Sequence, residues 1–167
     1  TLDRSSAASD VYKRQINISD AIQELRLIKS SKEIEAFKES AKWARLAHKY
    51  LEESIQVGAY EDEVSLIAQL KATSSAIRAS DNVYHIVVGF RGQIGAHSFY
   101  PHSLNIHAKI KYGDVLVTGA SANVEGYGAE LERTLLVGKP DEKKEKYFNL
   151  MLKAREIVFE NLRPGVK

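Results

Sequence analysis

The sequence GDVLVTGASANVEGYGAELERT, at residues 113–134, decides the fold of this 167-residue chain. Val115 and Val117 alternate with Asp114, Leu116 and Thr118, which is the period-2 pattern of a half-buried strand. Gly119 and Gly126 interrupt the pattern, and a second alternating run covers 127–137. The stretch therefore predicts two neighbouring strands.

The second run carries two carboxylates on one face. Side chains alternate across a strand, so Glu130, Glu132 and Thr134 share a face while Leu131 and Arg133 lie on the other. The two carboxylates would be about 6–7 Å apart at the usual rise per residue. Such a face suits cations, protons or a basic partner.

The same stretch resembles the pita-bread metallopeptidases, which include methionine aminopeptidase, aminopeptidase P, prolidase and the non-peptidase relative creatinase. In that family a Gly-Asp pair precedes a strand ending in Asp-x-Gly-Ala, and eleven residues after that Asp a second Asp opens Asp-x-x-Arg-Thr. Gly113-Asp114 matches the pair, and ELERT at 130–134 matches the second motif with Glu130 for Asp. Eleven residues before Glu130 is Gly119. The resemblance thus implies that Gly119 marks a missing metal ligand.

Three helices are predicted around these strands. Ser30 and Glu33 form a capping box, Gly58 ends the first helix, acids at 61–63 open the second, and Asp141 caps the third. The first helix has an apolar stripe at Ile34, Phe37, Ala41, Ala44, His48, Leu51 and Ile55. The third presents Phe148, Met151, Val158 and Leu162 on its inner side.

Further strands are predicted at 83–89 and 96–100, with a loop over 74–82. Strands run together rather than alternating with helices, so we expect an α+β fold with a curved, mostly antiparallel sheet backed by helices. The resemblance implies the pita-bread fold, truncated to its first αβ half and the beginning of the second.

The two ends lead us to expect part of a longer protein. Residues 1–15 lack periodicity, and 10–15 is what one reading frame of a sequencing-library transposon end would encode, so 1–15 is predicted to be a non-native or disordered tail. A linker and short helix would occupy 16–29, and a partial catalytic-type domain 30–167. In two-domain relatives of the family, a sequence like LRLIKS at 25–30 directly follows the N-terminal domain.

Composition sets broad limits on partners. A formal net charge of +2 in a chain with 28% charged residues gives no indication of nucleic-acid or membrane binding. The sequence has no cysteine, which excludes disulfides and thiol chemistry and is compatible with the cytoplasm that we expect. The resemblance implies a peptide or small amide substrate and allows a homodimer of the full-length protein.

His102 is the candidate catalytic residue. Pro101-His102 lies eleven residues before Gly113, the offset of the family's active-site Pro-His, and the resemblance implies substrate contact. A neutral imidazole near pH 7 can donate or accept a proton. Neighbouring Tyr100 is a weaker candidate for substrate binding. The other interpretation of His102 is a loop histidine without a catalytic role.

The remaining histidines give weaker signals. His97, His102 and His107 are five residues apart, which fits neither helical nor strand ligand spacing, so a three-histidine metal site is disfavoured. His48 lies on the apolar helix stripe and His85 within the 83–89 strand, so both are predicted to be satisfied core histidines.

Three functions remain open. The leading one is an aminopeptidase P or prolidase-like metallohydrolase, inactive as this fragment. The resemblance implies that Glu130 and, more weakly, Glu132 would bind Mn, Co or Zn, and that one His and two Glu ligands would come from beyond the chain. Gly119 favours the second, a creatinase-like hydrolase of C–N bonds that needs no metal. The third is a non-catalytic peptide- or protein-binding module. The alternative to metal binding at Glu130 and Glu132 is a surface salt-bridge face with Arg133 or nearby lysines.

Overall fold

The structure, a computed structural model, describes residues 17–79, 81–104 and 106–166, so the predicted tail at 1–15 lies outside the described residues. The chain divides into two compact units, Thr1–Glu35 and Ala36–Lys167. Their elements, in chain order, are the helices α2 (Ser19–Leu27), α3 (Ser31–Ser54) and α4 (Glu61–Ala79), strand β1 (Val83–Gly89), the 3₁₀ helix η1 (Gly95–His97), strands β2 (Val115–Val124) and β3 (Tyr127–Leu136), and helix α5 (Glu142–Asn161).

The three strands form one antiparallel sheet in the order β1-β2-β3. Glu125 and Gly126 connect β2 to β3, and both have positive φ angles, 51° and 88°. Two left-handed residues in a two-residue turn match the twist of a tight hairpin. This turn pairs Val124 with Tyr127 and so determines the register of the whole hairpin. The predicted α+β class and antiparallel strand pair are confirmed.

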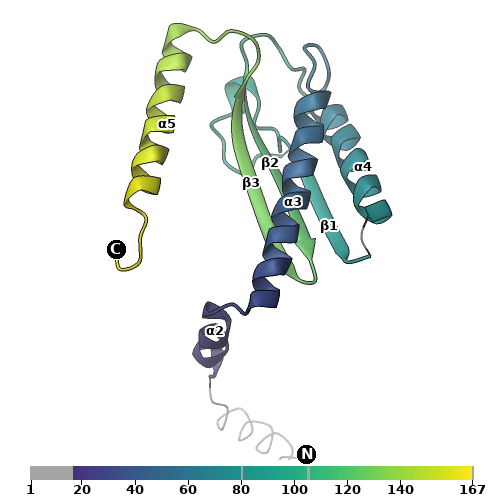
Figure 1. Cartoon of the computed structure of the whole chain (residues 1–167). Coiled ribbons are helices and arrows are strands. Elements are labelled where there is room, and N and C mark those ends of the chain that lie inside the picture. Colours follow the sequence, from purple (N-terminus) through teal and green to yellow (C-terminus); the bar gives the residue numbers. More distant parts are fainter. Residues whose placement is uncertain (1–16, 80, 105, 167) are drawn as a thin grey trace, which may run out of the picture. The chain divides into compact units, whose positions relative to one another are not determined.

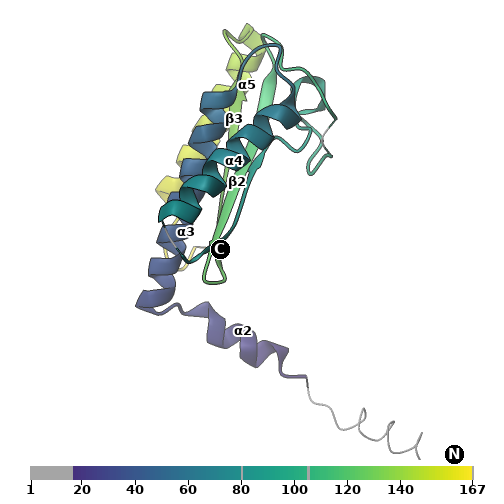
Figure 2. The same ribbon diagram turned by 90° about the vertical axis from the view of Figure 1, so that its right-hand side faces the viewer.

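Helices α3 and α4 cover the same face of the sheet (Figures 1 and 2). Alternate residues of β2 are buried beneath them: Leu116, Thr118, Ala120, Ala122 and Val124. The helices contribute many small residues, which let their backbones approach the sheet closely. Those buried from α3 are Ala36, Ser40, Trp43, Ala44, Ala47, His48 and Leu51. The buried face of α3 is therefore only partly the predicted stripe, because Ile34 is 43% exposed and Ala41 is also exposed.

Buried polar side chains join the layers. The Ser40 hydroxyl donates to the Tyr127 carbonyl (2.6 Å) and accepts from the Val124 N–H (3.1 Å), which ties α3 to the hairpin. The Gln69 side chain accepts from the Val88 N–H and donates to the Ile86 carbonyl, so it satisfies the outer edge of β1. These contacts satisfy backbone groups that would otherwise be orphaned.

Two predicted segments differ in the structure. The loop predicted at 74–82 is wrong for its first part, because α4 continues to Ala79 with Ala72 and Ala76 buried. The strand predicted at 96–100 is wrong. Bonds from His97, Ser98 and Tyr100 N–H groups to carbonyls three residues earlier wind this segment into 3₁₀ turns, with Gly95 at φ 54°.

The capping predictions for Ser30, Glu33 and Asp141 are confirmed. Ser30 N–H donates to Glu33 Oε2 (2.6 Å), and Glu33 N–H donates to Ser30 Oγ (3.4 Å). Asp141 Oδ1 accepts from the Lys144 N–H (2.8 Å) at the start of α5. The prediction that Gly58 ends the first predicted helix is wrong, because α3 ends at Ser54 and Gly58, with φ 91°, lies in the turn that follows. Among the described residues, no helix is both long and apolar enough to cross a membrane.

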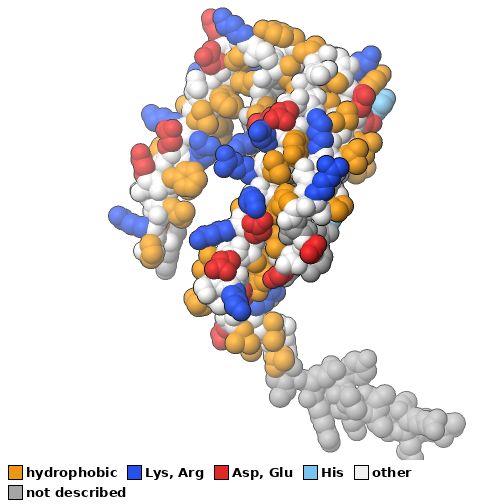
Figure 3. Space-filling model, turned by 45° about the vertical axis from the view of Figure 1, so that its right-hand side comes forward, with side chains coloured by type: hydrophobic (Ala, Val, Ile, Leu, Met, Phe, Trp, Pro, Cys, Tyr) orange, Lys and Arg blue, Asp and Glu red, His pale blue; other side chains and the backbone are white. Residues whose placement is uncertain are grey.

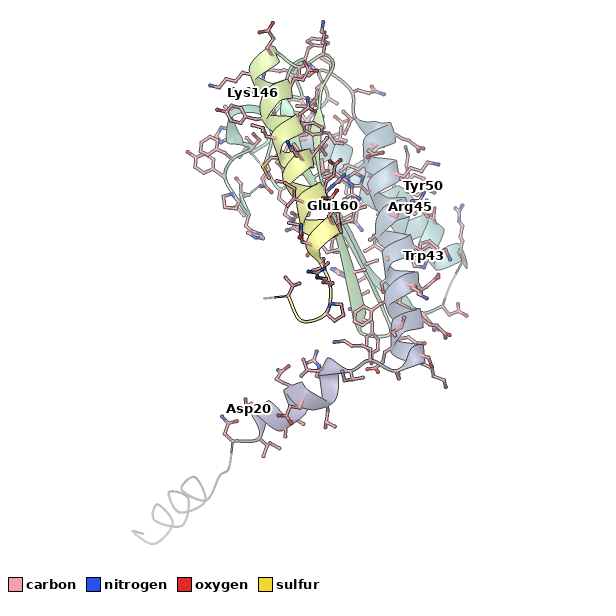
Figure 4. All side chains as sticks on the ribbon, turned by 60° about the vertical axis from the view of Figure 1, so that its left-hand side comes forward. Asp20, Trp43, Arg45, Tyr50, Lys146 and Glu160 are labelled. Carbon is pink, nitrogen blue, oxygen red and sulfur yellow. The ribbon has the colours of Figure 1, made fainter. Side chains whose placement is uncertain are left out.

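Helix α5 buries no residue. Its predicted inner side is largely exposed: Met151 is 69% exposed, Val158 58% and Leu162 72%. Figure 4 shows its side chains, among them Lys146 and Glu160, projecting around the helix. The prediction of a buried inner face is therefore wrong in this structure.

Candidate functional site

The uncovered face of the β2–β3 hairpin carries the predicted carboxylates. Directly paired residues project on the same side of a sheet, and the register pairs Gly119 with Glu132 and Ser121 with Glu130. Glu130 and Glu132 are both exposed, whereas the alternate residues of β2 are buried under the helices. The predicted sharing of one face by Gly119, Glu130 and Glu132 follows from this register.

Glu130 forms a surface ion pair, as one interpretation predicted, but its partner is Arg91 and not Arg133 or a lysine. Arg91 Nη2 lies 3.5 Å from Glu130 Oε1, with the two side chains 38% and 58% exposed. Arg91 follows β1 in a turn and has a left-handed φ of 52°, which aims its side chain independently of the strand alternation. Glu130 thus points away from packed hydrocarbon and takes part in a solvent-accessible ion pair.

Gly119 leaves space for a side chain beside Glu132. A Cβ built on Gly119 would lie 3.9 Å from both Cγ and Oε1 of Glu132, which is ordinary van der Waals contact. The φ angle of Gly119 is not in the left-handed region. The glycine is therefore not required by the backbone, and the Glu132 side chain reaches toward the place that a residue at 119 would occupy.

The carboxylates are suitable in kind for a divalent cation but too few. Hard divalent ions take oxygen ligands from Asp and Glu, usually several of them. Within the described ranges, no three His, Asp or Glu side chains are grouped so that they could hold a metal ion. Glu130 and Glu132 as metal ligands remain a prediction, and the described residues do not supply a complete donor set.

His102 lies on the segment between η1 and β2, where it is exposed and has φ 52°. In the described part of the chain, no hydrogen bond or ion pair joins its imidazole to Glu130 or Glu132. Tyr100 is 50% exposed and packs against Phe99, with ring centroids 4.1 Å apart. The structure therefore does not bring His102 into contact with the carboxylates, and its catalytic role stays a prediction.

His48 and His85 have different environments. His48 is buried, with Nε2 2.8 Å from Thr118 Oγ1 and Nδ1 3.1 Å from Glu52 Oε1. Burial lowers the pKa of His48, and Glu52 partly offsets this effect. His48 is thus a core histidine as predicted. His85 is exposed, so the core prediction for it is wrong: it falls on the side of β1 that the helices leave uncovered.

A groove of 630 Å³ lies between α3 and β3. Arg45 and Lys49 from α3 and Arg133 from β3 line it, together with the acids Glu52 and Glu130. Figure 3 shows Lys and Arg side chains gathered in a hollow on this part of the surface, and Figure 4 labels Arg45 on α3. The cationic side of this groove was not predicted, because α3 and β3, which supply it, are distant in the sequence.

The N-terminus of α4 holds two further acids that sequence reasoning treated only as helix-stabilising charges. Asp62 Oδ2 lies 2.7 Å from His107 Nδ1, and this hydrogen bond lowers the pKa of Asp62. The His107 ring stacks on Tyr60 at 4.0 Å. Glu61 is fully buried and accepts two backbone N–H bonds. Their only signal in the sequence was the run of three acids at 61–63.

Comparison with known proteins identifies the family. The sequence pattern of metallopeptidase family M24 matches residues 35–167, which is most of the chain. The chain belongs to this family. It is 28% identical over 151 residues to a Xaa-Pro dipeptidase of Pyrococcus horikoshii and 31% identical over 153 residues to an uncharacterised peptidase of Methanocaldococcus jannaschii. Each match covers 89% of this chain and 41% of the relative, so the chain spans about two fifths of their length.

Solved structures agree on the fold of this M24 chain. The prolidase from Thermococcus sibiricus matches with a TM-score of 0.79 at 26% identity, covering 99% of this chain and 44% of that one. The prolidase from Pyrococcus horikoshii matches with a TM-score of 0.76 at 26% identity, covering 89% and 41%. An Escherichia coli aminopeptidase P shares the fold at 21% identity, with 90% and 33% covered. The resemblance to the pita-bread family is confirmed, and the chain is a partial pita-bread α+β domain.

Proposed function

We propose that this M24 chain supplies one wall of the active site of a Xaa-Pro peptidase-like hydrolase. The observation that carries the proposal is the β2–β3 register, which puts positions 119, 130 and 132 on one uncovered face. The relatives named Xaa-Pro dipeptidase and prolidase support the substrate class, a peptide with proline after the scissile bond. Most of their length is not matched by this chain, so the activity belongs to a protein of their full length.

The carboxylates of Glu130 and Glu132 would contribute oxygen ligands to a divalent cation such as Mn²⁺, Co²⁺ or Zn²⁺. When bound, such an ion lowers the pKa of a coordinated water and polarises a carbonyl. We assign no catalytic step to it here, because these two acids do not complete a donor set. Gly119 lacks the carboxylate that the family pattern predicts, so we expect the chain alone to bind metal weakly and to be inactive.

His102 and Tyr100 would contact the bound substrate. The exposed imidazole of His102 can donate a hydrogen bond to the oxygen of the scissile carbonyl as negative charge develops there. It can also carry a proton to the leaving amine. Tyr100, half-exposed beside Phe99, offers an aromatic surface for the residue next to the scissile bond.

Two observations favour a metal-independent alternative. Arg91 lies 3.5 Å from Glu130, so a fixed positive charge already stands beside the predicted ligand, and position 119 has no carboxylate. A creatinase-like hydrolase of C–N bonds would need His102 and no metal. A non-catalytic peptide-binding module is the third candidate. The Arg91–Glu130 ion pair and the absence of a carboxylate at position 119 are also what loss of a metal site would leave.

Turnover of Xaa-Pro dipeptides tests these candidates in a protein that carries this sequence at the length of its relatives. We expect hydrolysis that requires Mn²⁺ or Co²⁺, is abolished by chelation, and falls about 100- to 10,000-fold in His102→Ala. Activity that survives exhaustive chelation but is lost in His102→Ala would replace the leading proposal with the metal-independent one. Peptide binding without any turnover would favour the binding module.

A further inference from the structure

Glu61 is the most deeply buried acid among the described residues, with 0% of its surface exposed. It is the first residue of α4. Its two carboxylate oxygens accept from different amides: Oε1 from the Ile106 N–H at 2.7 Å and Oε2 from the Gly92 N–H at 3.2 Å. A buried carboxylate is costly unless it is hydrogen-bonded, and the positive end of a helix dipole favours it. The proposed function does not use this residue.

The two amides that Glu61 binds flank the segment that carries His102. Gly92 precedes it and Ile106 follows it, so one carboxylate joins the two ends of a compact surface loop. The ends also touch directly, because a Cβ built on Gly92 would lie 2.0 Å from the Leu104 carbonyl oxygen. Only glycine fits there, and its φ of 71° also favours glycine.

The loop is anchored to the sheet next to the candidate site. Gln93 accepts a hydrogen bond from the Val117 N–H (2.9 Å), and Ile94 forms a bridge with Leu116. Gly95 packs against Asp114, since a Cβ there would lie 2.8 Å from Asp114 Oδ1. The loop thus leaves from beside the first half of β2, near Gly119.

We propose that Glu61 is a positioning residue that clamps Gly92 and Ile106 together and thereby fixes His102, which lies between them, in its left-handed backbone conformation. The proposal rests on the proposed role of His102 for its catalytic meaning, but the clamp itself is a property of this chain. An exposed histidine on a loop with free ends would sample many positions. A loop whose ends are held by two charge-assisted hydrogen bonds samples fewer positions. The histidine is therefore ordered before the substrate binds.

The substitution Glu61→Gln tests whether both hydrogen bonds of the Glu61 carboxylate are needed. A carboxylate can accept from both amides, whereas a glutamine side chain has one acceptor oxygen and an NH₂ group that donates. Glu61→Gln therefore keeps the shape and loses one of the two bonds, with an NH₂ group facing a backbone N–H. Glu63→Gln is the matched control, since it makes the same change in the same helical turn at an exposed residue.

Hydrogen exchange of backbone amides in the full chain tests the clamp without any activity. In Glu61→Gln we expect the Gly92 and Ile106 amides to exchange at least about tenfold faster, with β2 and β3 protected as in the wild type. Glu63→Gln should leave all of these rates unchanged. Wild-type protection of 92–106 in Glu61→Gln would overturn the proposal, and so would equal loss of protection across β2 and β3, because Glu61 would then support the whole fold.

The His102 ring provides a second readout that a merely structural role would not change. In Glu61→Gln we expect the NMR resonances of the His102 ring to move toward those of a free histidine, while those of His48 stay in place. Gly92→Ala, which pushes a methyl group against Leu104, should produce the same shift with Glu61 intact. Unchanged His102 resonances in both variants would contradict positioning. If the shift occurs but His102→Ala does not affect turnover, the clamp stands and the proposed function fails.

Discussion

Gly119 on β2 lies directly opposite Glu132 on β3, and a Cβ on Gly119 would be 3.9 Å from the Glu132 carboxylate oxygen. The position where the family pattern has an acid is thus open and adjacent to an acid that this chain possesses. Since the backbone at Gly119 is not left-handed, an L-residue fits without strain. An acid at position 119, which the family resemblance predicts, would thus need only a change of side chain on this strand pair.

Arg91→Gln should affect cation binding more than stability. The Arg91–Glu130 pair is solvent-accessible, so its loss should change the free energy of unfolding by no more than about 1 kcal/mol. Removing the positive charge beside Glu130 should tighten Mn²⁺ binding roughly three- to tenfold. Urea unfolding and calorimetric titration measure the two effects. Lys42→Gln, which breaks an exposed pair with Glu39 on α3, is the control and should not alter Mn²⁺ binding.

Ser40→Ala should destabilise the fold. The Ser40 hydroxyl bridges the Val124 N–H and the Tyr127 carbonyl at the end of the hairpin, and the side chain is fully buried. Its removal leaves a buried backbone donor without this partner, at a cost of about 1–3 kcal/mol in the free energy of unfolding. Ser54→Ala, whose hydroxyl donates to the Tyr50 carbonyl of its own helix, should cost less than half as much. Equal losses in urea melts would contradict the bridging role.

His48 should make stability depend on pH. Burial lowers its pKa below the ordinary value of 6.5, with Glu52 opposing the effect and Arg133 adding to it. Below pH 6.5 the unfolded chain takes up this proton more readily than the folded chain, so the free energy of unfolding falls as the pH falls toward the folded-state pKa. His48→Gln should flatten this part of the urea-derived stability profile between pH 7.5 and 5. His85→Gln, at an exposed position, should leave it intact; a profile unchanged by His48→Gln would refute the assignment.

The β2–β3 hairpin and the start of helix α3 were predictable because their signals are local. The alternating runs at 114–118 and 127–137 and a capping box at Ser30 each determine a backbone conformation on their own, although β2 continues through Gly119, where the pattern was interrupted. The buried stripe of α3 was harder to predict. Hydrophobicity favours Ile34, but the helix packs through Ala36 and Ser40, since small residues allow close approach to β2.

The site was predictable only where it lies on one strand pair. Gly119, Glu130 and Glu132 share a face because the strand period is two. Arg91 and Glu61 were missed as site residues, because their partners are 31 to 45 residues away and no local pattern marks them. The segment at 96–100 has strand-like composition, but Gly92 and Gly95 turn the chain before it and place it in a closed loop.

Calorimetric titration of Gly119→Asp with Mn²⁺ tests the central claim, that the uncovered face of β2 and β3 is a cation-binding face deprived of one acid. We expect weak binding by the wild-type chain, binding at least about tenfold tighter in Gly119→Asp because a third carboxylate joins Glu130 and Glu132, and a return to weak binding in Gly119→Asp/Glu132→Gln. Equal Mn²⁺ affinity in wild type and Gly119→Asp, with the fold intact, would contradict the account.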